Sequence, residues 1–293
     1  MMKKVLSIFS VMLLTLVLVG CTKRIQLKEK KYEAQTEVTK IEVKEISMPI
    51  EVIKDESIDN VMISYFSDEE YKLNITMSVP SKTLALKREQ DTTMFAPTIT
   101  FQSGCKTVIH LPNTYEGSLK IDSVNGSVSV DNMSLTELDI DLTNGSTELK
   151  TLTISESLKI DNTNGGVNIN DSTLNKADIE ITSGSLTINN TNINERIKTD
   201  LTNGSTKFNN VVANEYELKS TNGSTTLKNI ECNVLLSVKA VTGSIDIELR
   251  GNESDYKTTL SSNVGSVKGQ TSSGDKSVSC ETNVGSIEVK YLG

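Results

Sequence analysis

The residues of this chain that could take part in catalysis are few, and most of them recur at regular intervals. Asp122, Asp141 and Asp161 each stand four residues before a glycine, and Asp139 lies close to them in the sequence. A column of carboxylates could collect divalent cations, and paired carboxylates are required for the hydrolysis of polysaccharides. Alternation of side chains along a solvated strand predicts the same column without any ligand. We therefore predict no metal site and no catalytic residues.

The remaining reactive side chains lack partners at recognisable motifs. The single His, His110, has no Ser or Cys placed near it in a catalytic pattern. Cys105, Cys232 and Cys280 are too widely spaced for a disulfide framework or a zinc site. We expect neither enzyme activity nor a cofactor.

The fourth Cys belongs to a targeting signal. The chain opens "MMKKVLSIFSVMLLTLVLVGC", a basic start followed by an apolar run shorter than the roughly 20 residues that span a bilayer. Leu18, Val19, Gly20 and Cys21 resemble the bacterial lipobox, in which the Cys is lipidated and becomes the mature N-terminus. We expect residues 1–20 to be a signal peptide and Cys21 to hold the protein on the extracellular face of the membrane. The alternative is an ordinary signal peptide with a chance Cys.

Charge gives weaker indications about partners. Residues 21–36 are expected to form a tether, whose basic residues either lie against anionic lipid or are simply solvated, since Glu29 and Glu33 dilute them. The net charge of −8 argues against a nucleic-acid partner, because phosphate binding requires clustered Lys and Arg.

A repeat organises the rest of the chain. Glycines recur 19 to 22 residues apart, and such periods are typical of solenoids. These glycines are Gly126, Gly145, Gly165, Gly184, Gly204, Gly223, Gly243, Gly265 and Gly285.

Mostly apolar residues flank these glycines with a period of two. They stand five and seven residues before the glycine and two and four residues after it, which predicts two short strands with one buried face per repeat. Stacked coils need the same residue types in register, because equivalent residues of neighbouring coils lie about 4.8 Å apart. Cys280 falls in one of these apolar columns and Cys232 in a further one, nine residues after the glycine, whereas Cys105 lies outside the repeat. We predict an all-β fold, with a β-solenoid of coils of about 20 residues over residues 119–293 and a strand-rich N-terminal cap over residues 37–118.

The glycines are predicted to form sharp corners, since Gly adopts positive φ without steric cost. Asn precedes five of them and can form a ladder of amide hydrogen bonds between coils. Val264 and Val284 replace this Asn, so the ladder should end before Gly265 and Gly285. A calcium site at the corners would need a pattern such as G-G-x-G-x-D, which is absent, so a structural role is predicted. The five are Asn125, Asn144, Asn164, Asn203 and Asn222.

The C-terminus is expected to leave an open strand edge. The sequence "GSIEVKYLG" ends directly after a strand, with no capping segment behind it. Such an edge is either blunted by outward charges, here Glu288 and Lys290, or available to a partner strand.

The stretch "VIHLPNTYEGSLKIDSVNGSVSV", Val108 to Val130, followed by repeated T-N-G-S strand pairs, resembles the DUF4097 family over approximately residues 40–291. The resemblance implies a β-helical, surface or envelope-associated domain that is labelled adhesin by analogy. It implies no catalytic residues.

The function expected from these observations is a lipid-anchored extracellular binding or structural module of the bacterial envelope. Its expected partners are the membrane, through the lipid, and either a cell-wall polymer or an envelope protein. The alternative is an envelope-stress regulatory or sensory lipoprotein that acts through a protein partner. The absence of Trp and the scarcity of aromatic residues argue against a typical glycan site.

Overall fold

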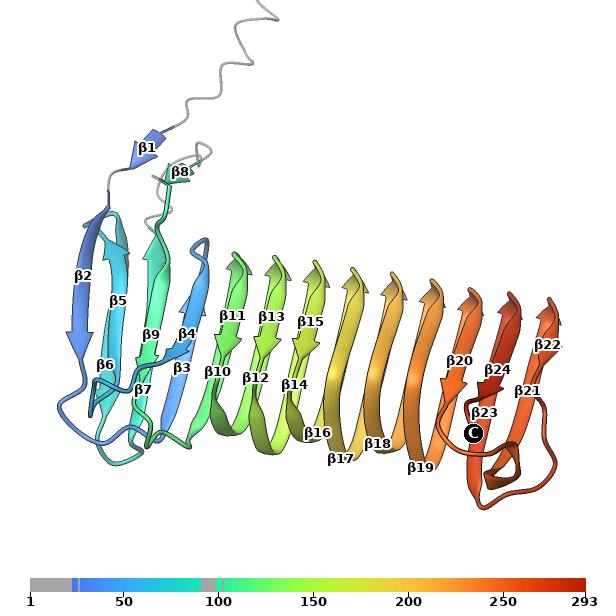
Figure 1. The fold of residues 1–293 in the computed structure, drawn as a ribbon. Helices are drawn as coiled ribbons and strands as arrows, with labels where there is room; N and C mark the ends of the chain where they lie inside the picture. Colours follow the sequence, from blue (N-terminus) through green and yellow to red (C-terminus); the bar gives the residue numbers. More distant parts are fainter. Residues whose placement is uncertain (1–22, 26, 91–98, 102) are drawn as a thin grey trace, which may run out of the picture.

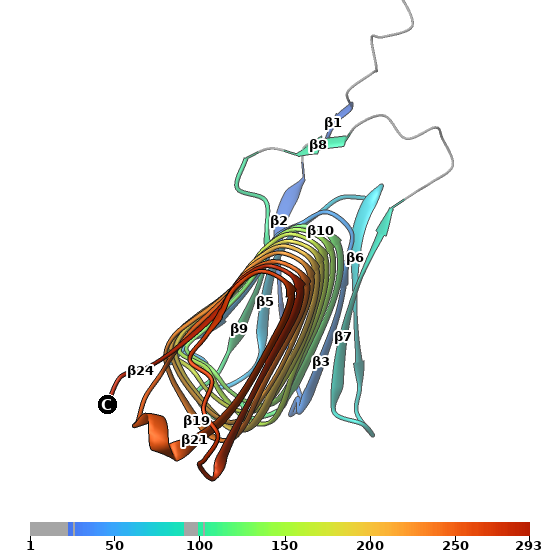
Figure 2. The same ribbon diagram turned by 90° about the vertical axis from the view of Figure 1, so that its right-hand side faces the viewer.

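The computed structural model describes residues 23–25, 27–90, 99–101 and 103–293. It is an all-β rod of stacked coils, so the predicted β-solenoid is confirmed (Figure 1). The view along the rod shows that the coils superpose as a flattened loop (Figure 2). Among the described residues, no helix is long and apolar enough to span a membrane.

Each regular coil has two corners. The first lies at the recurrent glycine, and the second lies six residues later at a residue whose φ is between +49° and +57°. A register shift, such as that between Leu135 and Glu137, then bends the chain towards the next layer. The second corner is formed by Asn132, Thr151, Asp171, Asn190, Asn210 and Asn229. The strands of these coils are β10 (Ser118–Asn125), β11 (Val128–Asp131), β12 (Ser134–Asn144), β13 (Thr147–Lys150), β14 (Thr153–Asn164), β15 (Val167–Asn170), β16 (Thr173–Ser183), β17 (Leu186–Asn203), β18 (Thr206–Asn222), β19 (Thr225–Thr242) and β20 (Ile245–Leu249).

Neighbouring coils pair in parallel with equivalent residues in register. Leu119 is the partner of Leu138, which in turn is the partner of Leu158. The predicted apolar columns fill the interior of the rod, and Cys232 and Cys280 are buried within them.

A further inward column, three residues before the glycine, includes polar side chains. Asn162 donates to the carbonyl oxygens of Gly145 and Gly165 at 3.2 and 3.1 Å, and Thr282 donates to that of Gly243 at 3.1 Å. These bonds satisfy backbone carbonyls that the tight corners would otherwise leave buried without partners.

At the C-terminal end the layers are out of sequence order. β23 (Lys276–Val284) pairs with both β19 and β21 (Tyr256–Val264), and β24 (Ile287–Tyr291) pairs with both β20 and β22 (Val267–Lys268). The expectation of an open edge at the C-terminal strand is therefore wrong, because the chain first builds the outermost layer and then returns to fill the gap (Figure 1). A short 3-10 helix, η2 (Glu253–Asp255), precedes this outermost layer.

The N-terminal portion contributes layers to the same rod and shows the same inversion. β3 (Lys40–Glu45) and β4 (Ile50–Lys54) pair in parallel with β10 and β11. On their outer side lie β7 (Thr83–Gln90) and β9 (Thr107–Leu111), which come later in the sequence.

Antiparallel strands cover this end of the rod. β6 (Tyr71–Ser78) pairs with β7, and β5 (Met62–Ser67) pairs with β9. β2 (Lys28–Glu33), which lies within the segment expected to be a tether, pairs with β5, and a separate parallel pair is formed by β1 (Lys23–Ile25) and β8 (Ile99–Phe101). The N-terminal end is thus capped, as solenoid ends require.

One buried ion pair joins the layers of the cap. Arg88 of β7 and Glu45 of β3 both have fully buried side chains, with Nε 3.0 Å from Oε1 and Nη2 3.1 Å from Oε2. Arg88 Nη1 also donates to the carbonyl of Phe66 at 2.7 Å, and its guanidinium lies 4.7 Å from the ring centre of Tyr71.

The inverted order at the C-terminal end predicts a specific cross-link. Asp246 is the Cα partner of Glu288, which is the partner of Lys268, so positions 246 and 268 are two layers apart, about 10 Å. A disulfide requires Cα atoms within about 7 Å, so an Asp246→Cys/Glu288→Cys protein should cross-link on mild oxidation. The matched Asp246→Cys/Lys268→Cys protein should not, as judged by mass spectrometry. Cross-linking of the second protein but not of the first would mean that the layers follow one another in sequence order.

Candidate binding surfaces

The recurrent glycines form a continuous structural column. Eight of the nine predicted corner glycines have φ between +135° and +151°, and an added Cβ at Gly184, the ninth, would lie 1.9 Å from the carbonyl oxygen of Gly165. Amide hydrogen bonds join Asn144 to Asn125 at 2.9 Å and Asn164 to Asn144 at 3.0 Å. Those hydrogen bonds lie on the surface and occupy amide groups that could otherwise bond to a ligand.

The ladder changes position towards the far end. Ser183 interrupts the ladder between Asn164 and Asn203. Asn222 then donates to Asn203 at 3.0 Å, after which Thr242, Val284 and Val264 occupy the Asn position. Asn263 nevertheless donates to Asn283 at 3.2 Å, one residue earlier in each coil. The ladder therefore stops where it was expected to stop, but one further amide pair forms beside it.

A second ladder runs along the other corner, and the sequence analysis missed it. Asn190 donates to Asp171 at 3.0 Å, and Asn210 donates to Asn190 at 2.9 Å. Arg250 closes this ladder by donating to Asn229 at 2.9 Å and to Asn210. The signal that could have revealed it is the Asn or Asp that recurs six residues after the glycine.

The other predicted site is at the N-terminus. Leu18, Val19, Gly20 and Cys21 lie outside the described residues, so the lipidation of Cys21 stays a prediction.

The carboxylates singled out in the sequence alternate with Lys. Lys120 lies 2.6 Å from Asp139, and this hydrogen bond raises the pKa of the Lys120 ammonium. Lys159 lies 2.7 Å from Asp161, which raises its pKa in the same way. Among the described residues, no group of three His, Cys, Asp or Glu side chains is placed to hold a metal ion.

His110 is not alone, contrary to the expectation from the sequence. Its Nε2 lies 3.3 Å from Ser64 Oγ, and its Nδ1 lies 3.5 Å from Asp55 Oδ2. Hydrogen bonds from Ser57, and secondarily His110, lower the pKa of the Asp55 carboxyl. Ser64 and Asp55 lie far from His110 in the sequence, so no sequence motif indicated that they would be its partners.

The order Ser–His–Asp is that of a hydrolase triad, but the surroundings differ. Ser64 lies within β5, which is hydrogen-bonded to β2 on one side and β9 on the other, so its own strand is not a nucleophile-bearing turn. None of the three hollows described for this surface includes Ser64 or His110. The contacts of His110 with Ser64 and Asp55 therefore connect β5, β9 and the loop after β4.

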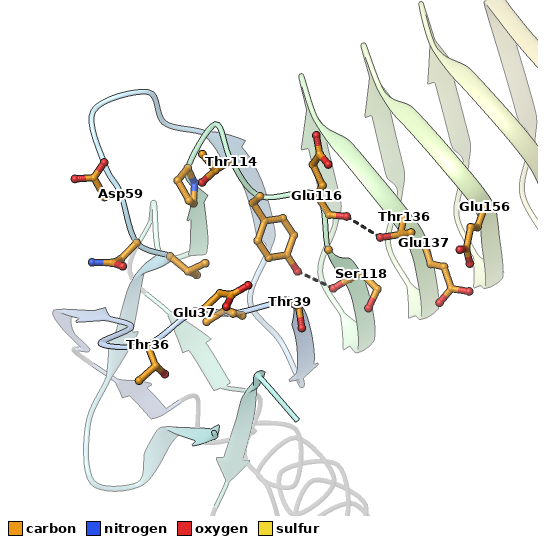
Figure 3. A pocket seen from close by; sticks show the side chains of 16 residues that line it. Thr36, Glu37, Thr39, Asp59, Thr114, Glu116, Ser118, Thr136, Glu137 and Glu156 are labelled. Carbon is orange, nitrogen blue, oxygen red and sulfur yellow. Dashed lines mark hydrogen bonds between the residues drawn. The ribbon is translucent and has the colours of Figure 1, made fainter. Parts of the chain in front are cut away.

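The largest of the hollows lies where the cap meets the rod (Figure 3). It encloses about 650 Å³ and is formed by the segments after β2, β4 and β9 together with the first coils. Hydrogen bonds from Tyr115 Oη to the Ser118 carbonyl, 2.8 Å, and from Thr136 Oγ1 to the Glu116 carbonyl, 2.6 Å, fix one wall. Its lining residues include no Lys or Arg and five carboxylates: Glu37, Asp59, Glu116, Glu137 and Glu156. Lys82 lies 2.5 Å from Glu37, so the negative charge that would favour a cationic ligand comes from the other four carboxylates.

The other candidate surface is the far end of the rod. Among the described strands, β21 is paired only with β23, and β22 only with β24. Thr271 covers part of this edge, since the N–H of Thr258 donates to Thr271 Oγ1 at 2.9 Å and the N–H of Thr271 donates to the Thr258 carbonyl at 3.3 Å. Two exposed valines belong to this outermost layer, Val264 (64% exposed) and Val267 (40%), and Val284 (48%) belongs to the layer below it.

The core thiols give a prediction about pH. Burial raises the pKa of the Cys232 thiol to about 11 and that of Cys280 to about 12, against an ordinary value of 9.0. The folded state therefore holds these two thiol protons more tightly than the unfolded state does. The contribution of the thiols to the free energy of unfolding is fully present below pH 9 and is lost as the pH rises towards 11–12. At pH 8, iodoacetamide should label neither thiol in the folded protein and both in urea, as measured by mass spectrometry. Labelling of both without denaturant would contradict the burial.

Comparisons with other proteins identify one matching family. The sequence profile of the family described as Toastrack DUF4097 matches residues 38–290. A solved structure described as a proposed adhesin from Parabacteroides merdae is 15% identical, with a TM-score of 0.43, and the match covers 92% of this chain and 99% of that one. A proposed adhesin from Bacteroides fragilis is 18% identical, with a TM-score of 0.42 and coverage of 90% and 99%. No curated protein matches significantly.

Proposed function

The chain belongs to the DUF4097 Toastrack family, and we propose that it is a lipid-anchored, non-catalytic binding module of the bacterial envelope. The observation that carries this proposal is the polarity of the rod. At one end the antiparallel strands β2, β5 and β6 cover the parallel layers, whereas at the other end the stack of parallel layers ends at β21 and β22 (Figure 1).

The anchor and the capped end lie close together along the chain. β2 begins at Lys28, only a few residues after Cys21. A lipid on Cys21 holds the capped end near the membrane and leaves the opposite end free. Nine glycine-centred layers and two N-terminal layers, at about 4.8 Å each, make a rod on the order of 50 Å long.

The surface of the rod suits a repetitive or extended partner better than a small substrate. Its outer faces are regular rows of charged and polar side chains, of which the Lys120–Asp139 and Lys159–Asp161 pairs are examples. The largest of the three hollows is open and acidic, so a cell-wall polymer with free amino groups is the ligand class that fits it.

Anchoring is tested by labelling the producing bacterium with a palmitate analogue. Wild-type protein should incorporate the label and fractionate with the membrane, and the Cys21→Ala protein should do neither. An unlabelled wild-type protein in the culture medium would overturn the anchor.

Binding is tested with residues 22–293 on purified cell-wall polymer and, separately, on solubilised envelope proteins. We expect saturable retention on the polymer that weakens with salt. Capture of one specific membrane protein instead, with no retention on polymer, would favour a regulatory lipoprotein.

The acidic hollow makes a sharper prediction for the same experiment. Glu116→Gln, Glu137→Gln and Glu156→Gln together should reduce retention on an amine-bearing polymer at least several-fold, because each exposed carboxylate loses its attraction to a cation. The matched control changes the same number of exposed acids elsewhere, Glu148, Glu253 and Asp275, and so keeps the net charge equal. Equal losses in both proteins would show that net charge, and not the hollow, attracts the polymer.

A further inference from the structure

We propose that a hollow over β18, β19 and β23 binds a phosphodiester group with an ammonium group next to it, the repeating unit of a zwitterionic envelope polymer. The charges of this hollow stand on the structure, and the assignment of the ligand to a polymer rests on the function proposed above.

Four charged residues in register line this hollow, which encloses about 330 Å³. Asp200 is the Cα partner of Lys219, and Lys219 is the partner of Lys239. Lys239 is in turn the partner of Glu281 in β23. Neighbouring layers are about 4.8 Å apart, so exposed charges run negative, positive, positive and negative along the rod.

The two lysines differ from the other basic register partners of the described chain. Lys219 and Lys239 have no ion-pair partner among the described residues. Two ammonium groups side by side repel each other, and an anion between them would relieve that repulsion. In the other two basic register pairs, every cation lies 3.1 to 3.9 Å from a carboxylate oxygen; these pairs are Lys44 with Lys87 and Lys176 with Arg196.

Small side chains form the floor of the hollow. Ser220 and Ala240 stand three residues before a glycine corner, the position that Leu142 and Leu201 occupy in other coils. Ser220 and Ala240 are each 7% exposed, whereas both leucines are completely buried. The small residues directly follow the two lysines in the sequence, so the rod is hollowed beside the unpaired cations.

The donors that line the hollow suit a phosphate oxygen. Each Lys ammonium carries three donors and acts as a point charge, the form in which Lys commonly binds phosphate. Thr221 adds a hydroxyl group. Asn283 Oδ1 accepts from Asn263 at 3.2 Å, so the N–H groups of the Asn283 amide remain as donors.

The two acids determine which phosphates fit. Asp200 and Glu281 cancel the charge of the two lysines, so the hollow gives a plain polyanion little long-range attraction. A second phosphate along the rod would also meet Asp200 or Glu281. An ammonium group next to the bound phosphate meets the same carboxylate favourably. The row of charges therefore matches a zwitterionic ligand.

The position of the hollow favours a polymer over the phospholipids of the anchoring membrane, whose zwitterionic headgroups have the same chemistry. Between β7 in the cap and β18 the layers follow in the order β7, β3, β10, β12, β14, β16, β17 and β18. Seven steps of about 4.8 Å place the hollow roughly 35 Å from β7. A rod that stands on its capped end holds the hollow away from its own membrane.

The first experiment titrates isotope-labelled protein, residues 22–293, with glycerophosphoethanolamine and follows the amide signals of β18, β19 and β23 by NMR. An open site should bind in the millimolar range, so concentrations up to about 20 mM are used. We expect saturable shifts at the residues of the hollow. Binding of glycerophosphoglycerol, which lacks the amine, and of ethanolamine, which lacks the phosphate, should be weaker. No saturable shift with glycerophosphoethanolamine overturns the site, and equal binding of glycerophosphoglycerol overturns the selection by the acids.

A pair of variants separates the hollow from net charge. Lys219→Gln/Lys239→Gln should weaken the binding of glycerophosphoethanolamine by at least about tenfold, because charge-assisted hydrogen bonds to the phosphate are lost. The matched control is Lys207→Gln/Lys228→Gln, which removes two exposed lysines of the same strands that lie outside the hollow. The control should bind normally. Equal losses in both proteins, with native circular dichroism, overturn the proposal.

The source of the ligand is tested on two surfaces, a purified wall polymer that carries phosphodiesters and amines, and vesicles with or without phosphatidylethanolamine. We expect retention on the polymer that falls in Lys219→Gln/Lys239→Gln but not in the control, and no preference for the phosphatidylethanolamine vesicles. Binding to those vesicles without retention on the polymer overturns the polymer assignment. Binding of glycerophosphoethanolamine without retention on any polymer overturns the function proposed above, whereas retention that the lysine variant leaves unchanged, without binding of the small probe, overturns this inference alone.

Discussion

A protein with Ala at position 165 is expected to lose more than about 4 kcal/mol of its free energy of unfolding, the range that marks exceptional substitutions. Gly165 has φ +139°, where a Cβ is strained, and that Cβ would lie 1.8 Å from the carbonyl oxygen of Gly145. The atoms that this Cβ would strike, the carbonyl oxygen and carbonyl carbon of Gly145, belong to the backbone, so no side chain can move aside to relieve the clash. The corner also carries the hydrogen bond from Gly145 N–H to the carbonyl of Asn164, 2.9 Å, and moving the chain outward would break it.

The next residue provides a matched control. An added Cβ at Gly166 would meet only the carbonyl oxygen of Ser185 at 3.4 Å, and its φ is not in the left-handed range. Gly166→Ala should therefore be neutral or slightly stabilising, by up to about 1 kcal/mol, because it restricts the unfolded chain. Urea unfolding followed by circular dichroism measures both proteins. Similar midpoints for the two would show that the glycine corners are looser than this structure indicates.

Removal of one partner of the buried ion pair in the cap should cost about 3–5 kcal/mol. In Arg88→Met, the Glu45 carboxylate keeps the N–H groups of Ile46 at 3.0 Å and Ser47 at 3.5 Å and the Thr107 hydroxyl at 3.2 Å, but it loses three contacts from the guanidinium. A buried charge without its counter-charge is what makes this substitution expensive. The free energy of unfolding in urea measures the loss.

The double variant separates pairing from packing. Arg88→Met with Glu45→Leu removes both charges and keeps the volume nearly constant, so it should be less destabilised than either single variant. With that result, the role of the ion pair is to fix the alignment of β7 with β3, and it adds little to the net free energy of unfolding. Losses that simply add would mean that the two side chains act independently, against the bidentate geometry observed.

The repeat could be read from the sequence because each of its positions is sampled many times. Nine glycines, their apolar neighbours and the Asn before five of them predicted the stacked coils, the core columns and the first corner. Local chemistry decides these features, since positive φ and alternation depend on a few adjacent residues. The signal-peptide prediction rests on a local pattern of the same kind, and it stays a prediction because Cys21 lies outside the described residues.

Only the tertiary structure decided which layer is outermost. Coils built on the same pattern can stack in either order with the same in-register pairing, so nothing in the sequence distinguishes β21 from β23 as the neighbour of β19. The partners of His110 and Arg88 were hidden for a related reason. Ser64 and Glu45 each lie more than 40 residues away, and contacts at such separations depend on how layers and cap strands are placed. The sequence by itself determined the coil, because its rules are local, and the fold determined the ends, the buried pair and the acidic hollow, because these arise only where distant segments meet.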